Sequence, residues 1–376
     1  MKQLFNIDWF FHREPLETTI DTFFNTKDWE PVDIPHDWMI YDSKDLYAQG
    51  VSCYKKTFTV PTLGLDRLSI LFEGVYMDNE IYLNGEKIFT WPYGYSQFEI
   101  DLTSYVKEGE NTIWVKNTYE LPNSRWYPGS GIYRNVWLVR RPAVHFTTDG
   151  GYLSAKKEGD AFILHADYEI QNDTDSACEV TLCHTVLAPD GKVAGTSKET
   201  LTIPCGLTVN KQTMTFEAPL LWDIESPNLY TVHSEIIKDE TAIDSSDERF
   251  GFRTIAFDPD KGFFLNGRNV KINGSCEHHT LGALGAAINR EAVRRQLTIM
   301  QKMGVNAIRS AHNMPAPELM ELCDEMGLLL YTESFDMWEH CKTDYDYGNY
   351  FKDWWKTDLT SWVRQDRNHP SVFIWG

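Results

Sequence analysis

Six polar side chains in the last third of the chain follow predicted strands, at the point where each strand ends. They are His278 and His279, Arg309 and His312, and Glu333 and Asp336. Imidazole, guanidinium and carboxylate groups can bind hydroxyls and transfer protons. Singly, each has a simpler explanation, since a loop histidine is usually solvated and Arg309 with Glu333 could form one structural ion pair. Together they predict an active site, because barrel enzymes carry out their chemistry where the strands end.

The elements that would position these side chains alternate between short apolar segments and segments of helical period, which is typical of a βα-repeat barrel. Strands are predicted at 270–274, 306–310, 328–334 and 372–375, and helices from Arg290, from Pro317 and over 351–364. Asn289 is a suitable N-cap, and Gly304 and Gly327 are suitable helix ends. Residues 257–376 thus form half of an eight-stranded TIM barrel. A hairpin at 263–270 is expected to cover the bottom of the barrel.

The first 256 residues predict two all-β units. Residues 1–142 show short alternating strands and an Asn84-Gly85 hairpin turn, which favours a jelly-roll sandwich. Residues 143–256 show about seven strands at regular spacing, which favours an immunoglobulin-like sandwich acting as a spacer. A Gly-rich loop at 123–134 carries Arg125 and Trp126. It is either an ordinary surface loop or a loop that reaches the pocket of another domain.

Composition limits the possible partners. The 376 residues carry a formal charge of −20, which argues against nucleic-acid binding, and no segment is apolar enough for a membrane span. The aromatic content of 14% suits sugar binding and sandwich cores equally. Seven cysteines without a C-x-x-C pair favour reduced thiols, and the N-terminus shows no signal peptide, so a cytoplasmic protein is expected.

Metal and cofactor signals are weak. Glu277-His278-His279 lacks the spacing of a helical zinc motif, and no quartet of Cys and His is present. The sequence therefore predicts no metal site and no cofactor.

Five motifs in order resemble glycoside hydrolase family 2, closest to its bacterial β-galactosidases. They are VDIPHDW at 32–38, GIYRNVWL at 131–138, GFR at 251–253 with FLNG at 264–267, NAIRSAH at 306–312 with LCDEMG at 322–327, and DRNHPS at 366–371 with Trp375-Gly376. The resemblance covers nearly the whole chain. It implies a sugar-binding jelly roll, an immunoglobulin-like domain and a catalytic barrel, in that order.

The resemblance also implies a function in carbohydrate catabolism, namely retaining hydrolysis of terminal β-D-galactosides by two Glu residues. The acid/base Glu is expected just after Gly376 and the nucleophile further on, so no catalytic residue is assigned within the chain and the 376 residues alone are expected to be inactive. Substrate-binding residues implied by the resemblance are His278, His312, Arg309, Glu333, Asp336, Arg125 and Trp126. A divalent or monovalent cation, as in some members, stays open. The substrate is an oligosaccharide or β-galactoside, and the full-length protein is a candidate homo-oligomer.

Two other functions remain open. One is a β-glucuronidase of the same family, and the other is a complete, non-catalytic carbohydrate-binding protein. A piece of an enzyme is favoured over the second, because four barrel strands leave an unpaired parallel edge and an open interior.

Overall fold

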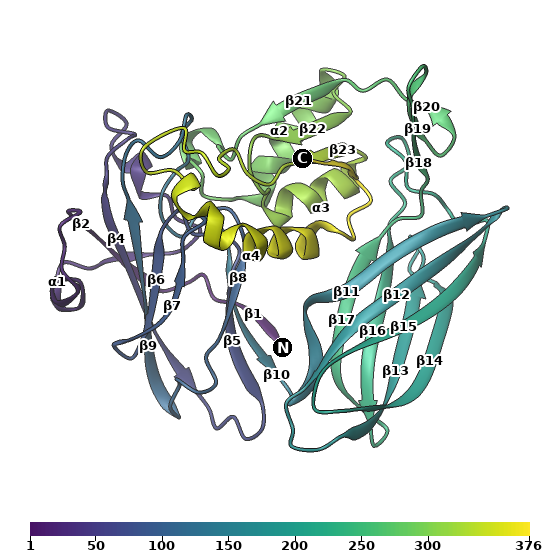
Figure 1. The fold of residues 1–376 in the computed structure, drawn as a ribbon, viewed down its shortest axis with the longest axis horizontal. Coiled ribbons are helices and arrows are strands. Elements are labelled where there is room, and N and C mark those ends of the chain that lie inside the picture. The colour runs from purple at the N-terminus through teal and green to yellow at the C-terminus, as the bar shows by residue number, and fades with distance from the viewer.

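The computed structural model describes residues 1–376, which form three units (Figure 1). The first is a sandwich of two antiparallel sheets with strand orders β1-β10-β5-β8 and β3-β2-β4-β9-β6-β7. Its strands are β1 (Lys2–Leu4), β2 (Trp9–Glu14), β3 (Glu30–Val32), β4 (Gly50–Val60), β5 (Arg67–Phe72), β6 (Asn79–Leu83), β7 (Glu86–Trp91), β8 (Phe98–Asp101), β9 (Gly109–Tyr119) and β10 (Val136–Arg141). The predicted jelly roll is confirmed.

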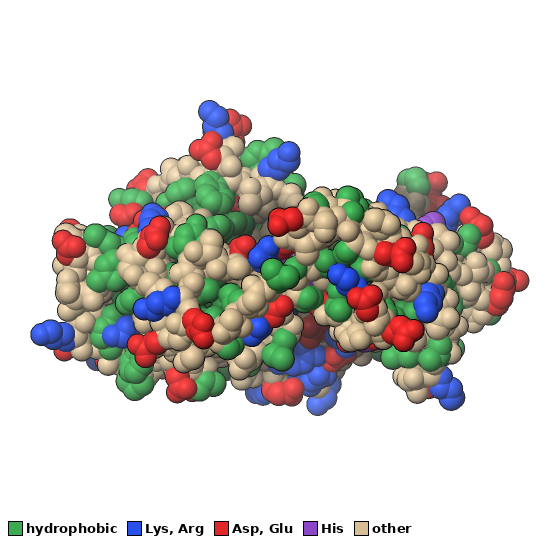
Figure 2. Space-filling model, turned by 90° about the horizontal axis from the view of Figure 1, so that it is seen from below, with side chains coloured by type: hydrophobic (Ala, Val, Ile, Leu, Met, Phe, Trp, Pro, Cys, Tyr) green, Lys and Arg blue, Asp and Glu red, His purple; other side chains and the backbone are tan.

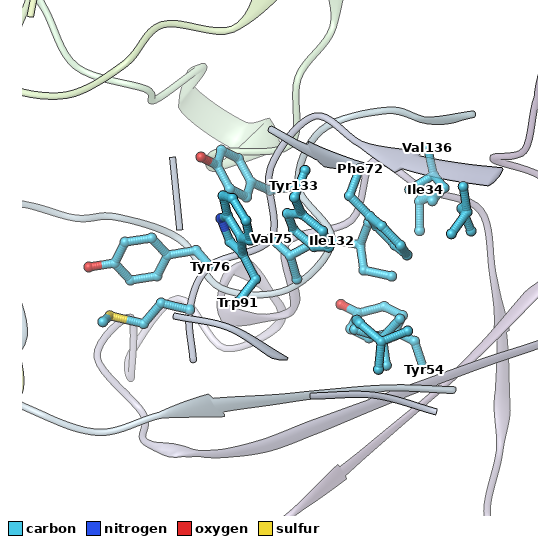
Figure 3. Close-up of a cluster of buried hydrophobic side chains, with 14 of the residues drawn as sticks. Ile34, Tyr54, Phe72, Val75, Tyr76, Trp91, Ile132, Tyr133 and Val136 are labelled. Carbon is cyan, nitrogen blue, oxygen red and sulfur yellow. The ribbon is translucent and has the colours of Figure 1, made fainter. Parts of the chain in front are cut away.

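Aromatic and aliphatic side chains from both sheets fill this sandwich, as Figure 3 shows for Tyr54, Phe72 and Val136. Along β9, every second residue from Asn111 to Tyr119 is buried, as expected for a strand with one face in the core. The predicted turn joins β6 to β7, with φ values of 53° at Asn84 and 89° at Gly85 that suit a type I′ hairpin. A short helix, α1 (Ile20–Asn25), and a 3₁₀ turn at Trp38–Tyr41 were not predicted.

The second unit is a seven-stranded sandwich with sheets β11-β12-β15 and β14-β13-β16-β17. The strands are β11 (Val144–Glu158), β12 (Ala161–Asn172), β13 (Cys178–Leu187), β14 (Val193–Ile203), β15 (Gly206–Glu217), β16 (Tyr230–Lys238) and β17 (Thr241–Phe250). Its core includes Tyr168, Leu182, Val232 and Phe252. The immunoglobulin-like fold is confirmed. All seven cysteines of the chain are free thiols in the structure.

The third unit contains a parallel sheet, β21-β22-β23-β24, with three helices. The elements are β21 (Gly274–Glu277), a 3₁₀ turn at Gly282–Leu284, α2 (Arg290–Lys302), β22 (Ala307–Ser310), α3 (Pro317–Met326), β23 (Leu329–Thr332), α4 (Gly348–Asp366) and β24 (Val372–Trp375). The Asn289 side chain accepts a hydrogen bond from Ala292 N at the start of α2, and Gly327 ends α3 with φ 70°. Half of a TIM barrel is therefore present, as predicted.

The predicted position of the first barrel strand, 270–274, is wrong. Val270 instead extends the hairpin of the sheet β18 (Ile255–Asp258), β19 (Gly262–Leu265) and β20 (Arg268–Asn269), where its N–H bonds Phe263 O at 2.9 Å. The Asn306 side chain then bonds Lys271 O at 2.9 Å and Asn273 N at 2.8 Å. The Asn306 side chain therefore forms hydrogen bonds with backbone groups of Lys271 and Asn273 that a neighbouring strand would otherwise have bonded. As a result, β21 begins only at Gly274.

Both sandwiches contact the barrel unit, whose α4 lies above and between them (Figure 1). On the jelly-roll side, Ser361 Oγ of α4 donates to Gln97 O at 2.7 Å. On the other side, Arg364 of α4 forms two hydrogen bonds with Glu169 of β12, at 2.6 and 2.7 Å. No helix is long and apolar enough to span a membrane. Acidic and basic side chains are interspersed on the face seen in Figure 2.

Candidate active site

The strand ends of β21, β22 and β23 bring four of the predicted residues into contact. The parallel register aligns Cys276 with Arg309, and Arg309 with Tyr331. Arg309 Nε donates to Glu333 Oε1 at 2.6 Å, and Arg309 Nη2 lies 2.9 Å from His312 Nδ1. The His278 ring centroid lies 5.4 Å from that of His312. The predicted pair of Arg309 and Glu333 exists, but it belongs to a larger cluster.

The cluster determines which nitrogen of His312 carries its proton. A guanidinium can only donate, so His312 Nδ1 must accept from Arg309 and the hydrogen resides on Nε2. Nε2 is then a free donor for a ligand. Glu333 is 8% exposed and receives its charge-assisted bond from Arg309, while its backbone N–H donates to Ser310 Oγ at 2.9 Å. The hydrogen bond with Glu333 raises the pKa of Arg309, which stays charged.

His278 faces the same space as a neutral group. Burial lowers its pKa below the ordinary value, and the nearby His312 and Arg309 lower it further. A neutral imidazole offers one donor and one acceptor, which suits a sugar hydroxyl.

His279 lies elsewhere, although it is adjacent in sequence. Its ring centroid is 4.6 Å from that of Tyr95 in the jelly roll, and its Nε2 is buried without a partner. Burial lowers the pKa of His279 well below the ordinary value. The structure therefore separates the two histidines, and only His278 joins the cluster.

The loop at 123–134 reaches the barrel from the jelly roll. Its Trp126 ring lies 5.3 Å from His278 and 5.5 Å from His312, centroid to centroid, and its Nε1 donates to Tyr95 OH at 3.1 Å. The loop is thus not an ordinary surface loop. It supplies an aromatic wall to the cluster of His278, Arg309, His312 and Glu333.

Asp336 forms a separate contact. It is 6% exposed, accepts from Arg125 Nη2 at 2.7 Å, and lies 3.0 Å from Lys342 Nζ. Its Oδ2 has no partner. These hydrogen bonds join Asp336 to the jelly-roll loop rather than to Arg309, so Asp336 and Arg125 hold that loop on the barrel.

Sequence reasoning missed two jelly-roll residues that contact the strand ends. Arg134 is 1% exposed and donates to Met314 O at 2.8 Å and Pro315 O at 3.2 Å. Tyr93 places its hydroxyl 2.7 Å from Ser334 O. Arg134 stands inside the GIYR motif, which was a usable signal. Tyr93 follows an apolar strand and is indistinguishable from a core residue by pattern.

The residues of the cluster are not arranged for a metal ion. No group of three or more His, Cys, Asp or Glu side chains lies close enough together to hold one. The arrangement instead combines a charged guanidinium, two imidazoles and an aromatic wall, which are groups that bind polyhydroxylated rings.

Three family models match successive parts of the chain. They are glycosyl hydrolases family 2, sugar binding domain, at 26–142; glycosyl hydrolases family 2 at 152–253; and glycosyl hydrolases family 2, TIM barrel domain, at 259–376. Together they cover almost all of it.

Individual relatives agree with this match. A β-galactosidase of Bacteroides ovatus, BoGH2A, is 40% identical over 99% of this chain and 45% of its own length. A β-glucuronidase of Bacteroides fragilis is 30% identical over 92% of this chain and 52% of its own. The crystal structure of a family 2 member from Bacteroides cellulosilyticus superposes with a TM-score of 0.94 at 33% identity, over 100% of this chain and 51% of that one. The chain thus spans about half the length of the proteins it matches.

Proposed function

Because the chain belongs to glycosyl hydrolases family 2, we propose that the full-length protein hydrolyses terminal β-D-galactosides with retention of configuration. The observation that carries the proposal is the cluster of His278, Arg309, His312 and Glu333 beside Trp126. These residues stand at the strand ends where barrel enzymes bind their substrates.

In this proposal the terminal sugar binds against Trp126, and the two imidazoles contact its hydroxyls. The Nε2–H of His312 and the neutral His278 donate hydrogen bonds that shorten as the ring flattens toward an oxocarbenium ion. Arg309 orients the nucleophile, and Glu333 keeps the guanidinium in place through the 2.6 Å bond.

Retention requires two carboxyl groups about 5–5.5 Å apart, one as acid/base and one as nucleophile. The resemblance assigns neither role to a residue of this chain. The 376 residues by themselves are therefore expected to hydrolyse no aryl β-galactoside above background.

The second candidate is β-glucuronidase activity. It is favoured by the Bacteroides fragilis relative and by a likeness to a solved Bacteroides uniformis β-glucuronidase, with a TM-score of 0.87 at 28% identity. The galactoside is preferred because the β-galactosidase relative is more similar, at 40% identity.

Steady-state kinetics of the full-length protein with aryl β-galactoside and aryl β-glucuronide separates the candidates. We expect the higher kcat/KM for the galactoside, and NMR of the first product should show the β-anomer. A higher kcat/KM for the glucuronide would select the second candidate, and turnover of neither substrate would overturn the galactosidase proposal.

A further inference from the structure

We infer that Tyr93 of the jelly roll is a positioning residue, whose hydroxyl sets the spacing between the strand ends that carry His312 and Glu333. Tyr93 lies in the connection between β7 and β8, outside the barrel. Its predicted effect on catalysis rests on the proposed function, whereas its effect on the strand ends does not.

The hydroxyl of Tyr93 joins two segments of the barrel. It lies 2.8 Å from the side-chain amide oxygen of Asn313 and 2.7 Å from Ser334 O. A hydroxyl has one hydrogen, and the Asn313 amide nitrogen is buried without a partner. Turning the amide by 180° resolves both points, because Asn313 then donates to Tyr93 and Tyr93 donates to Ser334. The hydroxyl is therefore a two-sided bridge.

Each end of the bridge is adjacent to a member of the cluster. Asn313 directly follows His312, and Ser334 directly follows Glu333. The Arg309 guanidinium contacts both His312 and Glu333, so it reaches both only at a suitable distance between the segments after β22 and β23. The Tyr93 hydroxyl fixes that distance by bonding Asn313 and Ser334.

The Tyr93 ring is itself held rigidly. It is 3% exposed, and its centroid lies 4.3 Å from that of Tyr347 and 5.3 Å from that of Phe335. Close packing on two sides leaves the hydroxyl little freedom. Arg134 holds the same segment from a second point, through Met314 O and Pro315 O. The jelly roll thus determines where the residues after β22 lie.

Removing the hydroxyl should displace the cluster without emptying the core. Tyr93→Phe keeps the ring but leaves the buried Asn313 amide and the Ser334 carbonyl without this partner. Small misplacements of catalytic groups reduce turnover steeply, so we expect kcat to fall by about 10- to 100-fold with KM changed by less than about twofold.

The matched control is Tyr54→Phe. The Tyr54 hydroxyl is also buried and bonded, at 2.7 Å from His36 Nδ1, and it lies inside the sandwich (Figure 3). Both variants should lower the unfolding temperature of the full-length protein to a similar extent, but only Tyr93→Phe should lower kcat. Equal kcat in the two variants would overturn the inference.

A second measurement does not depend on activity. Hydrogen–deuterium exchange of the 376-residue chain should become faster in peptides covering 311–316 and 333–337 in Tyr93→Phe, and should stay unchanged there in Tyr54→Phe. Unchanged exchange in both would overturn the inference. If the wild-type full-length protein hydrolyses no glycoside, the proposed function fails while this exchange experiment still decides the role of Tyr93.

Discussion

The two β-sandwiches contact the barrel at opposite ends of its strands and with different parts of their folds. The jelly roll uses loop residues, Arg125, Trp126 and Tyr93, which meet the segments after β22 and β23. The immunoglobulin-like domain uses strand β11, which meets the segment before β24, and both sandwiches also contact α4. Loops can project side chains into a site, whereas paired strands present a fixed surface. Both domains are β-sandwiches, but the jelly roll contributes side chains next to the cluster, whereas the immunoglobulin-like domain supports the barrel away from it.

The contacts of the immunoglobulin-like domain are specific but lie away from the cluster. Asn368 Oδ1 accepts from Leu153 N at 2.9 Å, and Arg367 Nη2 donates to Asp149 O at 2.6 Å. Within the barrel unit, His369 Nδ1 contacts Asp324 Oδ2 of α3, and Ser371 N donates to Asp324 Oδ1 at 3.0 Å. These bonds hold the start of β24. We therefore expect substitutions beside the immunoglobulin-like domain to change stability, and substitutions beside the jelly-roll loops to change turnover.

The largest effect should come from His312→Ala in the full-length protein. Loss of a contact made mainly in the transition state should lower kcat and kcat/KM together by about 10²–10³-fold, or roughly 3–4 kcal/mol. Steady-state kinetics measures both parameters. Near wild-type kcat would remove His312 from the site.

The neighbouring histidines provide the control for that prediction. His278→Ala should resemble His312→Ala, whereas His279→Ala should change kcat far less, because His279 packs against Tyr95. Equal losses of kcat in His278→Ala and His279→Ala would contradict the separation of the two rings.

A smaller effect on turnover is expected from Trp126→Ala. An aromatic contact is worth about 0.5–1.5 kcal/mol beyond its area, so kcat/KM should fall by about two- to twelvefold. The unfolding temperature should change little, because Trp126 lies in a partly exposed loop. If Trp126→Ala changed stability but not kcat/KM, the jelly-roll loop would only support the barrel, as the immunoglobulin-like domain does.

Stability of the supporting side should decrease with rising pH. Burial raises the pKa of Asp366 to about 7, above that of the unfolded chain, so the folded state holds a proton that the unfolded state has lost. This contribution is present at low pH and is lost as pH rises through about 7, by about 1 kcal/mol between pH 6 and 8. His369, whose pKa is also raised, acts in the same direction.

Denaturant unfolding of wild type and Asp366→Asn at pH 6 and pH 8 measures this dependence. The variant should show a smaller decrease in the free energy of unfolding than the wild type. Identical decreases would show that Asp366 is not the group that titrates.

The smallest effect should come from Arg364→Gln. Its ion pair with Glu169 is partly exposed, with 26% and 19% of the two side chains accessible. Such pairs contribute about 1 kcal/mol or less, a loss that calorimetry should detect, and kcat should stay within about twofold of wild type. A loss of turnover without a loss of stability would place the immunoglobulin-like domain in the catalytic machinery.

The spacing of apolar residues and the residues that begin or end helices were sufficient to predict most elements of the barrel unit. The N-cap at Asn289, the Pro317 start and the Gly327 end each depend on backbone chemistry within a few residues, so they are visible in one sequence. The first strand was misplaced because the bonds that occupy 271–273 come from Asn306, more than thirty residues away.

Sequence alone therefore determined the three folds, their order and the polar residues at the strand ends, because these follow from local period and turn chemistry. Only the tertiary structure decided which of them meet. His278 and His279 are adjacent in the chain, yet packing against Trp126 and Tyr95 directs them to different neighbours. Tyr93 and Ser334 are 241 positions apart, and their contact arises only when the jelly roll docks on the barrel. Contacts between domains depend on how whole surfaces fit, which no local pattern encodes.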